Sequence, residues 1–190
     1  FQMTGGIKVH DTFPLLARVF SFGAARLLDI NQVQARSAGA LCRSLPIGSF
    51  TLTVAEAKII HISIDVPWRT VYDFAHRPEN MPLWAAGLAS GLTKDGDTWL
   101  ADGGPLGTVR VRFSPPNESG VIDHEVTMPD GMVIYNCLRV APNGDGAEVL
   151  FILLRQPGMD DAAFEADAQH VQSDLETLRA LMESGEGQRA

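Results

Sequence analysis

A chain of 190 residues, of which 45% are hydrophobic and 20% charged, can bury one full core but hardly two. Its net charge of −8 repels phosphate backbones, and no Lys/Arg stripe with interleaved aromatics follows any segment, so we expect no nucleic-acid partner. No run approaches the roughly 18 apolar residues of a membrane-spanning helix and no signal-peptide pattern is present, so we expect no stable membrane insertion.

The two cysteines indicate neither a disulfide framework nor a metal site. Cys42 and Cys137 lie far apart, without a C-x-x-C pair or a His spacing suited to zinc. No nucleophile elbow of the G-x-S-x-G type and no Gly-rich phosphate loop occurs either. We therefore expect no metal and no cofactor, and a reducing, cytoplasmic location.

Charge divides the chain. Residues 1–55 carry five basic and two acidic side chains, a net charge of +3, whereas the rest carries ten basic and twenty-one acidic ones, a net charge of −11. The first segment reads either as a poorly ordered extension or as a targeting or membrane-surface helix around 13–28. We expect one ligand-binding domain at 56–184 and a disordered tail at 185–190.

The domain opens with a strand and two short helices. Residues 57–66 alternate apolar and polar side chains, which predicts a half-buried strand that Pro67 ends. Residues 67–75 place apolar side chains at helical spacing behind that proline. A second short helical turn is expected at 79–84, closed by Gly87.

Strands then dominate the middle of the chain. The Asp-Gly pair within 94–97 is typical of a hairpin, and short turns separate the runs that follow. Such turns favour an antiparallel meander. The expected strands are 87–92, 98–102, 107–113, 120–128, 132–140 and 147–155.

The chain closes with a long amphipathic helix. Asp160 and Asp161 suit a helix N-terminus. Apolar residues then recur at three- and four-residue steps over roughly 27 Å, so this helix must lie against the sheet. The stripe consists of Phe164, Ala168, Val171, Leu175, Leu178 and Leu181.

This order of elements resembles the helix-grip architecture of the START-like (SRPBCC) superfamily. Its most specific part is IDVPWRTVYDFAHRPENMPLWAAGL at 64–88, which resembles the family's pattern of strand, proline, helix with V-Y-x-F, then P-E-N-x-P-x-W; PNGDGAEVLFILLRQPGM at 142–159 is similar to the same branch. The resemblance implies an α+β fold: a curved antiparallel sheet wrapped around the C-terminal helix, with two short helices after the first strand. A cavity is expected between sheet and helix.

Two polar residues fall on the faces of strands that should point inward. His124 shares the apolar register of 120–128, and Asn136 shares that of 132–140. Inward polar groups are costly unless they are paired or face a ligand. Three interpretations stay open: a structural pair, a pair that orients a ligand's polar group, or an acid/base role for His124.

The remaining candidates belong to the cavity rim or the surface. Trp68 is expected to fill the end of the core, while Trp84 reads equally as core or cavity mouth. Arg110 and Arg112 alternate toward solvent and Tyr135 toward the outer face or rim, and the carboxylates of Asp123 and Glu125 read as a solvated surface pair. The expected ligand-binding residues are Trp84, Leu88, Val111, His124, Asn136, Phe151 and Val171.

Two classes of function follow from the resemblance. The first is a binding module that holds a small hydrophobic or aromatic molecule between sheet and helix. The second is a polyketide cyclase/dehydrase-like enzyme in which His124 moves a proton and Asn136 or Trp84 positions the substrate. A co-chaperone-like surface is a weaker third interpretation, and a homodimer stays open as a partner. The sparse polar content favours binding.

Overall fold

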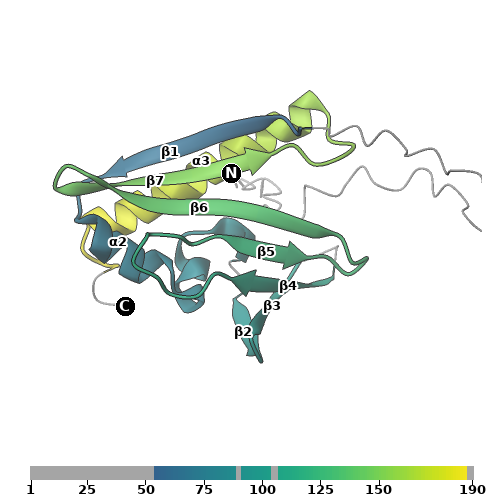
Figure 1. The fold of residues 1–190 in the computed structure, drawn as a ribbon, viewed down its shortest axis with the longest axis horizontal. Helices are drawn as coiled ribbons and strands as arrows, with labels where there is room; N and C mark the ends of the chain where they lie inside the picture. The colour runs from purple at the N-terminus through teal and green to yellow at the C-terminus, as the bar shows by residue number, and fades with distance from the viewer. Residues whose placement is uncertain (1–53, 89–90, 104–106, 188–190) are drawn as a thin grey trace, which may run out of the picture.

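The computed structural model describes residues 54–88, 91–103 and 107–187. Almost all of the 1–55 segment, with the expected helix at 13–28 and Cys42, lies outside the described residues, as do 188–190. Within the described residues, a seven-stranded antiparallel sheet covers one long helix, and two short helical regions lie at one end (Figure 1). The predicted order of strand, short helices, strands and final helix is confirmed.

The strands follow the chain around the sheet, with one exception. The spatial order is β1-β7-β6-β5-β4-β3-β2, so the first strand pairs with the last. This pairing brings the start of the first strand beside the end of the last strand, and the Arg155 N–H donates to the Glu56 carbonyl at 2.8 Å. The strands are β1 (Ala57–Ile64), β2 (Leu92–Asp95), β3 (Thr98–Asp102), β4 (Thr108–Phe113), β5 (His124–Thr127), β6 (Val133–Asn143) and β7 (Gly146–Leu154).

Four helical segments accompany the sheet: α2 (Trp68–Ala75), the 3-10 helices η1 (Pro78–Leu83) and η2 (Ala86–Leu88), and α3 (Asp161–Glu183). Asp160 caps α3, because its carboxylate accepts the Ala163 N–H at 2.8 Å. Beyond α3 the Gly187 N–H donates to the Leu181 carbonyl at 3.0 Å. Residues 185–187 of the segment expected to be disordered therefore fold back on the helix.

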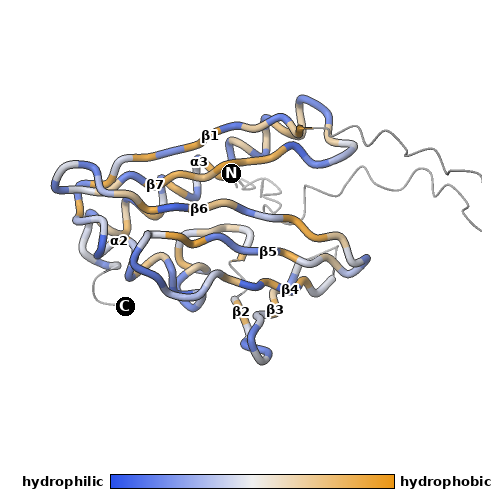
Figure 2. Tube along the Cα trace, viewed as in Figure 1, coloured by the Kyte–Doolittle hydropathy of each residue, from blue (hydrophilic) through white to orange (hydrophobic). Residues whose placement is uncertain are grey.

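The core lies between α3 and the concave face of the sheet. Figure 2 shows polar positions between apolar ones along β1 and an almost continuously apolar β7. Ile60, Ile62 and Ile64 are buried on β1, while Ile59, directly before them, points to the other face and is exposed. The stripe of α3 meets this face, and its predicted packing is confirmed for Phe164, Ala168, Val171, Leu175 and Leu178, all of which are buried.

One predicted strand is wrong. Residues 87–92 do not form a strand: Ala86–Leu88 is a 3-10 helix, and the hairpin strand begins only at Leu92. The backbone turns tightly here, because the Leu88 N–H donates to the Ala85 carbonyl and the Gly91 N–H to the Leu88 carbonyl, both at 2.9 Å. Leu88 is thereby directed into the core instead of alternating along a strand.

The strand predicted at 120–128 is shorter in the structure, where β5 covers only His124–Thr127. Asp123 interrupts the ladder, because its carboxylate accepts the Leu138 N–H at 3.1 Å where a regular strand would present a carbonyl. Gly120 has a φ of +70°, and a Cβ there would lie 1.9 Å from the Val140 carbonyl oxygen. This close approach requires glycine, and it returns the chain beside β6.

Shortening a side chain of the α3 apolar stripe that does not line the cavity should lower the stability of the domain. Leu178 is fully buried, so Leu178→Ala should cost about 2–5 kcal/mol of unfolding free energy. Glu176→Ala, on the exposed side of the same helix, should stay within about 0.5 kcal/mol. Urea denaturation of both variants checks this, and equal small losses would contradict the docking of α3.

Candidate functional site

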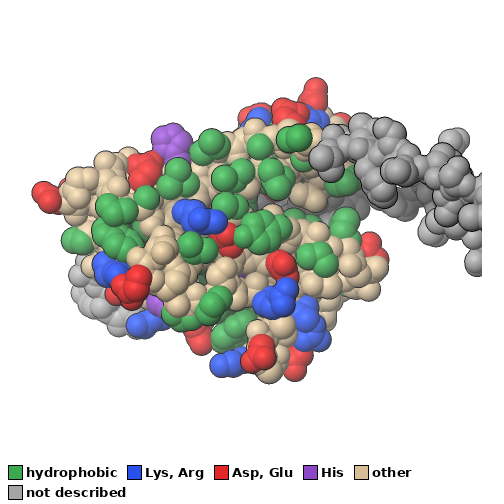
Figure 3. All heavy atoms as spheres, in the orientation of Figure 1, with side chains coloured by type: hydrophobic (Ala, Val, Ile, Leu, Met, Phe, Trp, Pro, Cys, Tyr) green, Lys and Arg blue, Asp and Glu red, His purple; other side chains and the backbone are tan. Residues whose placement is uncertain are grey.

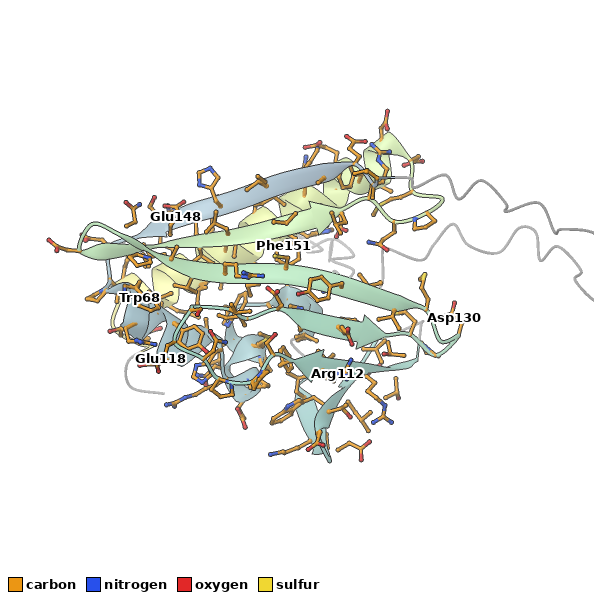
Figure 4. The ribbon with its side chains drawn as sticks, in the orientation of Figure 1. Trp68, Arg112, Glu118, Asp130, Glu148 and Phe151 are labelled. Atoms are coloured by element: carbon orange, nitrogen blue, oxygen red, sulfur yellow. The ribbon has the colours of Figure 1, made fainter. Side chains whose placement is uncertain are left out.

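A cavity of about 70 Å³ lies between the sheet and α3, near the 3-10 helices. All seven residues expected from the sequence line it, Phe151 among them, which Figure 4 labels on β7. Whether they contact a ligand stays a prediction. Sequence reasoning missed the other lining residues, which are Met81, Ala85, Gly87, Val126, Leu138, Asp174 and Leu175.

The wall made by the 3-10 helices is held to α3 by one polar contact. The Asp174 carboxylate accepts the Ala86 N–H at 3.0 Å, which fixes the start of η2 against the helix. Trp84, just before it, is only 6% exposed. Trp84 and Leu88 thus both lie in the cavity lining.

Trp68 has a different role at the far end of α2. It is partly buried against the core, and the Arg69 guanidinium lies over its ring at 4.5 Å. Arg69 also pairs with Glu118, and Figure 4 shows Trp68 and Glu118 together at that end. Trp68 therefore closes the end of the core, in agreement with the prediction, and does not line the cavity.

His124 and Asn136 face each other across β5 and β6. They are register partners, and the Asn136 Nδ2 donates to the His124 Nε2 at 3.1 Å. The other ring nitrogen, Nδ1, lies 3.2 Å from the Ile122 carbonyl oxygen, which can only accept, so Nδ1 carries the proton. Burial lowers the pKa of His124, although the Ile122 hydrogen bond and the nearby Asp123 charge oppose it. The imidazole is neutral, with both nitrogens engaged by the protein.

This pairing bears on acid/base chemistry. A general base needs a free lone pair within reach of the substrate proton. The lone pair on His124 Nε2 already accepts from Asn136. The Asn136 side chain, by contrast, keeps its carbonyl oxygen free of hydrogen bonds within the described residues, and it lines the cavity. Of the pair, Asn136 presents the available polar atom.

Two buried carboxylates on α3 were not expected. Asp167 and Asp174 are only 8% and 7% exposed. Burial raises the pKa of each to about 6; the charge of Asp174 raises that of Asp167 further, whereas the Ala86 N–H partly offsets the rise at Asp174. The sequence did carry the signal, since each lies three residues after a stripe residue, Phe164 or Val171.

Trp84 adds an unpaired donor. Its indole Nε1 is buried and has no hydrogen-bond partner within the part of the chain that the structure describes. Buried Trp N–H groups usually find an acceptor. The cavity wall therefore offers one donor without an acceptor as well as the carboxylate of Asp174.

The outer face of the sheet corrects one surface prediction. Asp123 is not solvated: it is 4% exposed and accepts hydrogen bonds from Arg139 and Tyr135. Burial alone would raise the pKa of Asp123, but these two hydrogen bonds, together with the Arg139 charge and the Leu138 N–H, lower it below its usual value. Arg112 pairs with Glu125 on the exposed face, as expected. Figure 3 shows this face, with hydrophobic side chains spread over β1, β7 and β6.

Among residues 54–88, 91–103 and 107–187, no cluster of His, Cys, Asp or Glu is arranged to hold a metal ion. None of the helices in these ranges is long and apolar enough to cross a membrane.

Solved structures decide the architecture. A protein of the dynemicin biosynthetic locus, DynU16, superposes with a TM-score of 0.54 at 12% identity over 68% of this chain and 48% of its own. Aha1 from Colwellia psychrerythraea, a dimer, gives a TM-score of 0.53 at 12% identity over 68% and 98%. BH1534 from Bacillus halodurans gives 0.52 at 12% over 68% and 99%. The chain has the helix-grip fold.

The helix-grip likeness extends to the fold alone at these identities. The chain spans about half the length of DynU16. No protein-family model and no curated protein matches the sequence. The helix-grip resemblance inferred from residues 64–88 and 142–159 is confirmed, and the ligand has to be argued from the cavity itself.

The His124–Asn136 pair should behave as a coupled unit. His124→Leu or Asn136→Leu alone leaves a buried partner unpaired and should cost about 1–3 kcal/mol. The double variant removes both polar groups and should recover most of that loss. Chemical denaturation of the four proteins measures the coupling; strictly additive losses would mean that the two side chains do not depend on each other.

The buried carboxyl of Asp167 should destabilise the fold at neutral pH. Because its folded pKa is raised from 3.8 to about 6, its favourable contribution is fully present below pH 3.8 and is lost as pH rises through 6. Asp167→Asn should therefore gain on the order of 2–3 kcal/mol above pH 7 and almost nothing at pH 4. Thermal melts across this range test it, with the exposed Asp73→Asn as control; a gain that is independent of pH would argue against a raised pKa.

Proposed function

We propose that the protein binds a small hydrophobic or aromatic molecule in the cavity between the sheet and α3. The observation that carries the proposal is an apolar lining interrupted by a buried polar atom that has no hydrogen-bond partner among the described residues, the Trp84 Nε1. Merely structural polar groups are paired, as His124 is. Unpaired ones are costly unless a bound molecule completes them.

The size of the cavity limits the ligand. Sites for drug-sized molecules usually enclose about 300–1,000 Å³, and an apolar cavity of about 150 Å³ admits benzene. At about 70 Å³, this one suits a molecule no larger than a single ring. Even a ring requires the lining to adjust, for which Met81, with its flexible thioether chain, is suited.

The enzyme alternative is less well supported. A polyketide cyclase/dehydrase-like activity with His124 as acid/base would need a larger site and an available imidazole nitrogen. The cavity volume and the Asn136 hydrogen bond to His124 both weigh against it. We therefore favour binding without a reaction.

Partner and location stay proposals. A homodimer is supported by the dimeric state of the structurally similar Aha1 and by exposed apolar side chains on the outer sheet face, namely Ile59, Val133 and Tyr135. Sedimentation velocity of the purified chain tests this. A cytoplasmic location rests on the sequence argument alone.

Filling the cavity should block binding. Val171 lines it, whereas Val149 is equally buried in packed core. Val171→Leu should keep the stability of the domain and weaken benzyl alcohol binding by at least about fivefold, roughly 1 kcal/mol. Val149→Leu should cost about 1–3 kcal/mol through overpacking and leave binding intact.

NMR titration of backbone amides reports the affinity, and native mass spectrometry of protein purified from its own host would identify the natural ligand. Unchanged affinity in Val171→Leu would place the binding site elsewhere.

A further inference from the structure

Asp174 is the ionisable residue of the described cavity lining that can still accept further hydrogen bonds. Asp174 lines the cavity from α3, and the described lining residues include no Lys or Arg. Its carboxylate accepts one hydrogen bond, from the Ala86 N–H at 3.0 Å, and no other within the described residues. A carboxylate can accept several more. Asp174 is thus a buried charge with most of its acceptor capacity unused.

The neighbouring residues of the lining add one further hydrogen-bond acceptor and one donor. The Asn136 carbonyl oxygen is a second free acceptor in the lining. The Trp84 N–H is an unpaired donor, which a ligand oxygen or the π face of an aromatic ring could satisfy. Most of the available hydrogen-bonding atoms in the lining are therefore acceptors, which require a donor on the ligand.

We propose that Asp174 makes the cavity selective for a small apolar cation, an ammonium group on a hydrocarbon or aromatic body, and that the same side chain rejects the corresponding carboxylate. This inference rests on the proposed function and adds the chemical class of the ligand.

Electrostatics favour the cation for two reasons. Folding has already removed the Asp174 carboxylate from water, so binding adds only the desolvation of the ammonium group. In addition, Trp84 and Phe151 offer aromatic faces that attract cations. An anionic ligand would meet a like charge in a low-dielectric site whose described lining holds no Lys or Arg to offset it.

The pH dependence follows from the groups around Asp174. The titratable neighbours are His124 across the cavity and Asp167 and His170 on α3; η2 contributes only the backbone N–H of Ala86. The ammonium binds the ionised carboxylate, and burial raises the pKa of Asp174 to about 6. Affinity for an amine should thus be about tenfold lower at pH 5 than at pH 8. A neutral alcohol should show no such loss.

The test compares three probes of similar size on the full chain, the isosteric benzylamine and benzyl alcohol and the carboxylate benzoate, titrated by NMR at pH 7.5 and pH 5. At pH 7.5 we expect benzylamine to bind at least tenfold more tightly than benzyl alcohol, and benzoate not to bind. Asp174→Asn, which can keep the Ala86 hydrogen bond, should remove the preference, so that benzylamine binds no more tightly than benzyl alcohol. Asp167→Asn, a buried carboxyl on the same helix outside the lining, should keep the preference for the amine.

The outcomes separate the two proposals. If benzyl alcohol binds and benzylamine binds no better, or if Asp174→Asn keeps the preference, the cation inference is overturned while the cavity proposal stands. If none of the three probes shifts the amides of the lining residues, the cavity proposal itself fails, and the cation inference with it.

Discussion

The packing of α3 across β1 and β7 is the contact on which the cavity depends. A straight helix cannot follow a curved sheet along its whole width, so it lies close to one half of the sheet and leaves the other. Phe164 and Leu178 are fully buried in the close half. The space left over β4, β5 and β6 is what the 3-10 helices and Trp84 close. A cavity is thus a geometric consequence of the fold, and its chemistry depends on which side chains reach it.

Polar groups that are buried, or that pair with a buried or half-buried group, fall into two kinds among the described residues. In the first kind, the protein itself supplies the hydrogen-bond partner: His124 pairs with Asn136, and Asp123 pairs with Arg139 and Tyr135. Asp174 and Trp84 are not compensated in this way. The first kind stabilises strand register and the irregular entry to β5. The second kind keeps hydrogen-bonding capacity that the protein does not use, which is the physical ground for regarding it as functional.

The two-residue alternation of strands and the three- and four-residue steps of helices predicted the fold well, because each pattern shows which face of an element is buried. The same rule placed His124 beside Asn136, whereas Trp84 and Leu88 were expected at the cavity from the helix-grip resemblance. It failed where side chains replace backbone partners: Asp174 caps the turn at Ala86, and Asp123 takes the Leu138 N–H. In these two contacts a side chain takes the place of a backbone partner across about 90 or 15 positions of the sequence, and no local pattern reports contacts at such separations. Asp174 itself was visible in the helix register, but acidic residues on an amphipathic helix are ordinarily solvated.

Size and chemistry constrain each other in this cavity. In a large, wet pocket, water would complete the hydrogen bonds of Asp174 and Trp84, and neither group would discriminate strongly between ligands. About 70 Å³ holds only about two water molecules. A ligand that fills this space displaces them, so its own polar group must meet the carboxylate directly. A mismatch is then not repaired by solvent, and the small volume is what turns a single buried carboxylate into a feature that selects a ligand.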